Sequence, residues 1–225
     1  PPIPDGVYAV AYRVISEDGH VAEGAYTFQI GTVVDAIDST ALIANALAGR
    51  TGPDGLSWVM AVARFVGFLG VAILLGALTM LAGGGIRSRA VVGLIAGSWS
   101  AAVIGAAALF ALQGVYVQAG NYADMFDTSL WGDTFNERIG TALVVRLILL
   151  LALGAYVLVL RGSIARSTTT WWRSSVALVG AGIVVSFSAA GHPSASSSAG
   201  LAIAIDAVHL AGVCLWLGGL VALVV

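Results

Sequence analysis

Asp206 and His209 are the residues whose type and spacing most clearly suggest chemistry, because they lie in the apolar stretch "DAVHLAGVCLWLGGL" (206–220). Positions i and i+3 share one face of a helix, and Trp216 continues the same stripe. Ionisable groups inside a membrane are costly and usually serve a function. An imidazole beside a carboxylate can bind a transition-metal ion, and the carboxylate alone can neutralise a buried cation.

Two interpretations of Asp206, the one acid inside any strongly apolar segment, remain open. Arg64 and Arg146 each lie about eight residues from one end of such a segment, or roughly 12 Å along a helix. In the first interpretation Asp206 pairs with one of these arginines, and His209 is an ordinary core histidine. In the second, Asp206 and His209 bind a metal ion together with His192 of the stretch "SAAGHPSASSSAG". The two can coexist, since an arginine can hold the carboxylate while the imidazole binds metal.

A membrane must position these residues, as the composition of the chain indicates. Of the 225 residues, 59% are hydrophobic and 10% are charged, whereas soluble domains have roughly 25% charged residues. A helix needs about 20 apolar residues to cross a bilayer. The sequence therefore predicts a mainly α, polytopic membrane helix bundle. It has five expected spans, at residues 57–82, 90–115, 139–160, 173–190 and 201–225.

The distribution of arginine predicts the orientation of the bundle. Loops on the cytoplasmic side of a membrane are enriched in basic residues. Five arginines lie in or beside the loops after the first and third spans: Arg87, Arg89, Arg161, Arg166 and Arg173. Most acids instead precede the first span or lie between the second and third spans. We expect a multi-pass protein of the cytoplasmic (inner) membrane, with the N-terminal domain and all three histidines on the outer side.

The N-terminal residues have a different pattern. Residues 7–15 and 24–30 alternate with period two, which is typical of β-strands, and the polar residues 16–23 connect them. Two strands alone are marginally stable in water, so we expect the last strands of a β-sandwich. A linker follows at 32–56, with one short helix expected at 35–48. The chain starts without an initiator Met and stops inside an apolar segment, which predicts a piece of a longer protein.

Residues 4–31, "PDGVYAVAYRVISEDGHVAEGAYTFQIG", closely resemble the C-terminal end of the CopC-type periplasmic copper-binding sandwich. The shared features are a strand, then Ser-x-Asp-Gly-His, then a last strand that ends in Phe-x-x-Gly. The apolar remainder resembles CopD, the membrane partner sometimes fused to CopC, chiefly in residues 206–220. The resemblance implies a CopC-like part at 1–31, a linker at 32–56, and a CopD-like transmembrane domain at 57–225 that is truncated at its C-terminus.

The resemblance implies that copper is the metal. In CopC-type domains the Asp and His of the turn bind copper(II) together with an N-terminal amine and imidazole, so Asp18 and His20 are the implied ligands here. The N-terminal ligand is expected outside this chain. The resemblance further implies that His192, Asp206 and His209 receive copper from the outer domain and pass it across or into the membrane.

Two other functions stay open: a haem b electron-transfer protein and a copper sensor or anchor that transports nothing. Haem b needs two facing imidazoles at membrane depth, and only His209 clearly lies there. No Walker loop, dinucleotide fingerprint, HExxH or GxSxG motif occurs, so we do not expect an enzyme. The expected partners are copper ion, the lipid bilayer and a periplasmic or extracellular copper carrier. No nucleic acid is expected, and the oligomeric state stays open.

Overall fold

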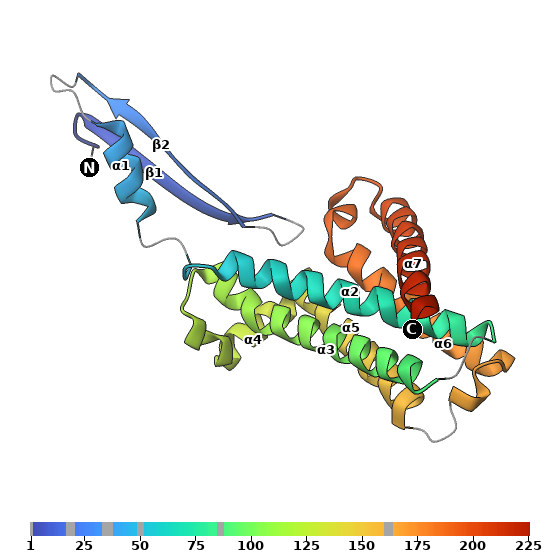
Figure 1. The fold of residues 1–225 in the computed structure, drawn as a ribbon. Helices are drawn as coiled ribbons and strands as arrows, with labels where there is room; N and C mark the ends of the chain where they lie inside the picture. The colour runs from blue at the N-terminus through green and yellow to red at the C-terminus, as the bar shows by residue number, and fades with distance from the viewer. Residues whose placement is uncertain (1, 17–20, 33–37, 49–51, 85–87, 160–163) are drawn as a thin grey trace.

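The computed structural model describes residues 2–16, 21–32, 38–48, 52–84, 88–159 and 164–225. In Figure 1 a β-hairpin with one short helix extends from one end of a bundle of long helices. The turn that holds Asp18 and His20 lies outside the described residues.

The hairpin pairs β1 (Gly6–Ile15) with β2 (Val21–Ile30) in antiparallel register. Tyr8 lies opposite Phe28, and their rings stack with centroids 5.7 Å apart. Gly24 lies opposite Tyr12, and a Cβ atom at Gly24 would come within 2.5 Å of the Tyr12 hydroxyl. The expected strands are confirmed, and the second begins three residues earlier than the period-two pattern indicates.

One short helix, α1 (Ser39–Leu47), packs against the hairpin. The carboxylate of Asp38 accepts hydrogen bonds from the backbone N–H groups of Thr40 and Ala41. This side-chain cap begins the helix, because it satisfies amides that have no partner within the first turn. The helix lies inside the predicted segment, whose first residues are outside the described part of the chain.

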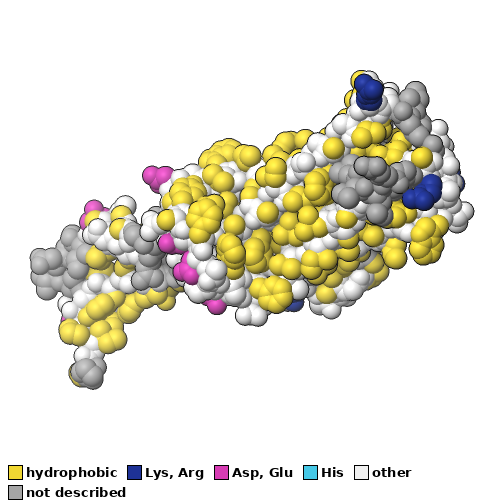
Figure 2. All heavy atoms as spheres, turned by 90° about the horizontal axis from the view of Figure 1, so that it is seen from below, with side chains coloured by type: hydrophobic (Ala, Val, Ile, Leu, Met, Phe, Trp, Pro, Cys, Tyr) yellow, Lys and Arg dark blue, Asp and Glu magenta, His cyan; other side chains and the backbone are white. Residues whose placement is uncertain are grey.

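Five helices are long and apolar enough to cross a membrane, which confirms the predicted spans. They are α2 (Leu56–Ala82), α3 (Arg89–Gln118), α5 (Arg138–Gly154), α6 (Thr170–Ala190) and α7 (Ala199–Val224). A π-helical turn, Ala155–Val159, extends α5. Apolar side chains cover the bundle in Figure 2, with acidic groups near the hairpin and arginines at the opposite end. The "hairpin end" below means the end of the bundle at Leu56 and Gln118.

The segments between the long helices are partly ordered into short helices. At the hairpin end, α3 and α5 are joined by η1 (Tyr122–Phe126) and α4 (Thr128–Asn136). At the same end, η4 (His192–Ala195) joins α6 to α7. The turn η3 (Ile164–Arg166) precedes α6 at the opposite end.

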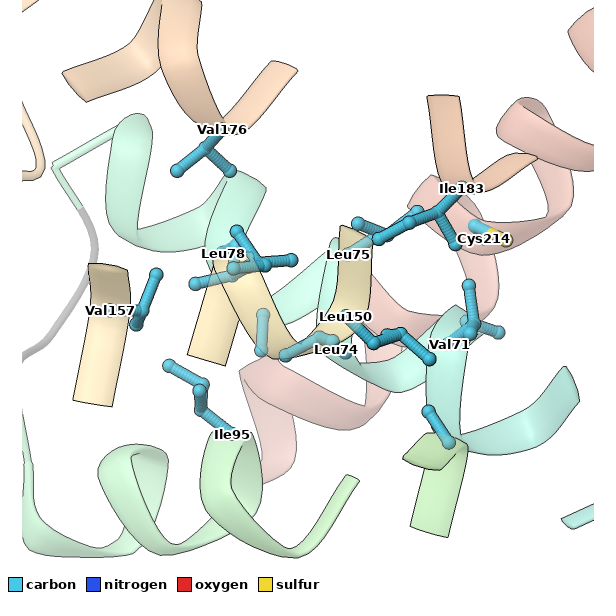
Figure 3. Packing of buried hydrophobic residues seen from close by; sticks show 14 of the residues in the cluster. Val71, Leu74, Leu75, Leu78, Ile95, Leu150, Val157, Val176, Ile183 and Cys214 are labelled. Carbon is cyan, nitrogen blue, oxygen red and sulfur yellow. The ribbon is translucent and has the colours of Figure 1, made fainter. Parts of the chain in front are cut away.

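Glycines allow the helix backbones to approach closely, as is usual in membrane bundles. A Cβ atom at Gly105 of α3 would lie 2.5 Å from the Cα of Gly67 in α2. At Gly76 of α2, a Cβ atom would overlap the backbone of Gly218 and Gly219 in α7. Beside this second contact, apolar side chains from α2, α3, α5, α6 and α7 form the main buried cluster (Figure 3).

Candidate functional site

The predicted membrane ligands lie on different elements of the structure. His192 is exposed at the start of η4, while Asp206 is partly buried and His209 exposed on α7. The segment of His192 is held in place, because Arg138 of α5 donates a hydrogen bond of 2.9 Å to the Ser194 carbonyl. Within the described residues, no three His, Cys, Asp or Glu side chains gather as a metal site would require. Among those residues, His209 is the one imidazole in a membrane-spanning helix.

Asp206 does not form the expected ion pair with Arg64 or Arg146. In the described part of the chain, the one ion pair joins Arg13 and Glu23. The reason is the way α7 crosses α2 instead of running beside it (Figure 1). The closest approach lies at Gly76 and Gly218, and Arg64 and Asp206 each lie one helical stretch of roughly 18 Å away from it. Because the two helices cross, equal distances along them from this contact do not bring the two residues together.

Arg146 is held by other groups. It is buried in α5 with 4% of its surface exposed. Its Nε donates to the Ser186 hydroxyl and its Nη2 to the Ser186 carbonyl, both at 3.0 Å. The guanidinium carbon also lies 3.4 Å from the centroid of the Phe187 ring, a cation–π contact. Polar dipoles and an aromatic face thus stabilise this cation where a carboxylate was expected.

A cavity of about 160 Å³ lies beside Arg146. Arg64, Gln113 and Phe187 line it together with Ala190 and Gly191 at the end of α6. Gln113 is only 1% exposed, and its Nε2 has no hydrogen-bond partner among the described residues. No pattern of the sequence marks Gln113, since a single amide in an apolar helix gives no periodic signal.

Glu137 precedes α5 near this region and is half-buried. Burial raises the pKa of its carboxyl group, and Asp133 adds to that rise, while the neighbouring amide of Gln113 opposes it. The Glu137 carboxyl group, which interacts with the Gln113 amide, thus has a weakened preference for its charged form.

A second feature that sequence patterns could not reveal is a link between the hairpin and the bundle. Arg13 of β1 donates hydrogen bonds to the carbonyls of Tyr116 at 2.6 Å and Val117 at 3.2 Å, near the end of α3. Its guanidinium also pairs with Glu23 of β2. Beside it lies a cleft of about 230 Å³, lined by Val21 and other residues of the hairpin and of α2. The strand ends next to the Asp18–His20 turn are therefore attached to the bundle.

Comparison with known proteins agrees with both parts of this architecture. The model of the CopC domain matches residues 1–31, and the model of the copper resistance protein D-like, N-terminal domain matches residues 55–203. No curated protein and no solved structure matches the chain. The second match covers more than half of the chain and includes four of the five spans and the start of the fifth. The chain therefore belongs to the copper resistance protein D-like family, with a CopC domain match at its N-terminus.

Proposed function

We propose that the outer hairpin captures copper and delivers it to the membrane domain, which carries it across or into the cytoplasmic membrane. The observation that supports delivery best is the attachment of Arg13 to the carbonyls of Tyr116 and Val117. It joins the strand that leads into the Asp18–His20 turn to the end of α3. A ligand released beside Arg13 would have a short path to the hairpin end of the bundle.

His192, Asp206 and His209 are the proposed receiving ligands. Imidazole and carboxylate suit copper(II), and ionisable side chains in membrane helices commonly mark ion pathways. Their separation on η4 and α7 fits transient binding better than storage, because conduction requires sites weak enough to release the ion. The proposed partners are copper ion, the bilayer and an outer copper carrier.

Acidic residues at the hairpin end support entry from that side. The segment between α3 and α5 carries Asp124, Asp127, Asp133 and Glu137. A surface of one sign raises the local concentration of the opposite ion. Copper cations would thereby be concentrated near His192 before they bind.

The proposed orientation can be tested by labelling in intact cells. Ser197 and Thr168 are exposed at opposite ends of the bundle, and Cys214 is buried. In a Cys214→Ala background, Ser197→Cys should react with a membrane-impermeant thiol reagent, and Thr168→Cys should react only after lysis. Labelling of Thr168→Cys in intact cells would show the inverse orientation.

The delivery step predicts a specific defect for Arg13→Gln in the full-length gene product. The variant should keep the copper(II) affinity of the outer domain, because Arg13 lies outside the proposed ligands, but it should transfer copper to the membrane domain several-fold more slowly. Copper affinity by competition and copper uptake into lipid vesicles measure the two properties. Glu23→Gln is the matched control, because it removes the ion pair and keeps the guanidinium. Uptake by Arg13→Gln at the parent rate would contradict delivery through this attachment.

A further inference from the structure

We propose that Arg64, Gln113 and Arg146 form a binding site for a small monovalent anion, chloride or a short carboxylate, inside the hairpin-end half of the bundle. The proposal does not depend on the copper function, because it rests on positive charges and N–H donors, which do not bind a copper cation. The three side chains come from α2, α3 and α5 and line one cavity.

The charge of the cavity lining favours an anion. Arg146 is buried, and within the described residues neither Arg146 nor Arg64 has a carboxylate within ion-pair distance. A charge removed from water is costly unless a partner compensates it. Ser186 and Phe187 supply dipoles and a π face to Arg146, but neither carries the opposite charge. An anion in the cavity would face two guanidinium groups.

The amide of Gln113 can donate a hydrogen bond to an anion. Its Nε2 is buried and makes no hydrogen bond of ordinary geometry in the described part of the chain, although the Glu137 carboxyl group lies close enough to interact with it. Gln113 lines the same cavity, and Glu137 does not. A buried donor left without a partner costs roughly 1–3 kcal/mol. A monovalent anion can accept a hydrogen bond from this amide while the guanidinium groups balance its charge. A guanidinium group can also donate two parallel hydrogen bonds to a carboxylate.

The size and position of the cavity suit a small anion. The cavity measures about 160 Å³, and one water molecule in the liquid occupies about 30 Å³. A chloride ion with a few waters, or a formate or acetate ion, therefore fits. Gly191, next to η4, lines the cavity. The cavity thus reaches the end of the bundle at which water-soluble ions would enter.

The test is thermal unfolding of the purified protein in detergent, titrated with sodium chloride or sodium acetate at constant ionic strength. Sodium MES, with its bulky sulfonate, balances the ionic strength. Chloride or acetate should raise the unfolding temperature in a saturable way, because a ligand that binds only the folded state stabilises it. A response to chloride alone would identify a halide site, and a response to acetate would identify a carboxylate site.

The variants decide whether this cavity is responsible. Arg64→Gln and Gln113→Leu should each raise the anion concentration needed for half-saturation at least about tenfold. A tenfold change corresponds to about 1.4 kcal/mol of binding free energy. Arg64 is exposed, so its replacement leaves the packing intact. Arg166→Gln removes an exposed cation at the opposite end and should respond like the parent. The proposal is wrong if chloride, acetate and MES act alike, or if Arg64→Gln and Gln113→Leu keep the parent response.

Discussion

Replacing Gly218 by alanine should prevent the stable folding of the membrane domain. The added Cβ atom would overlap the carbonyl of Ala72, which is completely buried in α2. The obstacle is backbone, so no side-chain rotation can relieve it, and α2 and α7 must separate. We expect a loss of about 3 kcal/mol or more, at the upper end of the usual cost of overpacking. Thermal unfolding and size-exclusion chromatography in detergent measure this loss.

Gly212→Ala is the matched control for this prediction. Gly212 lies on the same helix, and a Cβ atom there would meet nothing within 4 Å. Alanine also favours a helix over glycine by about 1 kcal/mol, so this variant should be as stable as the parent or slightly more. If Gly218→Ala unfolds at the temperature of Gly212→Ala, the close contact of α2 and α7 does not exist.

The second large effect is functional. His209→Gln should lower copper-dependent uptake many-fold, to a residual rate that can still be measured, while the protein still inserts and folds, because glutamine preserves size and polarity but binds copper poorly. His209 is exposed on α7, so its replacement removes little packing. Copper accumulation in cells and the unfolding temperature should be measured together, with Gly212→Ala as the control on the same helix. Parent-like copper handling by His209→Gln would leave the outer domain as the only copper binder.

Hydropathy predicted the five spans closely because lipid leaves few options for a chain. A spanning segment must satisfy its own backbone hydrogen bonds, so a long apolar run forms a helix. The first expected span, 57–82, differs from α2 by one residue. The hairpin was predictable for a similar reason, since period-two alternation pairs side chains such as Tyr8 and Phe28 on one face.

One short helix was missed although its signal was present. Asp127 accepts hydrogen bonds from the backbone and hydroxyl of Ser129 and caps α4. An Asp before a Thr-Ser pair is a common helix start. The segment is polar and short, however, and no apolar periodicity draws attention to it.

The contacts of the candidate site were beyond prediction for a different reason. Distance from a helix end gives depth, but it does not give the crossing of two helices or the rotation of each about its axis. The pairing expected for Asp206 depended on both. The same limit applies to Arg13, whose partners lie more than 100 positions away in the chain. No local pattern encodes such a contact.

Copper bound at the hairpin turn is proposed to pass to the membrane ligands along one route. A double-mutant cycle on copper uptake tests it, with His20→Ala, His209→Gln and the combined variant of the full-length gene product in lipid vesicles. The free-energy effects of two mutations add when the sites act independently, and they do not add when both sites act in one process. The account predicts that the combined variant takes up copper no more slowly than the slower single variant. If the two losses multiply, the hairpin and the membrane domain handle copper independently, and the proposed delivery is wrong.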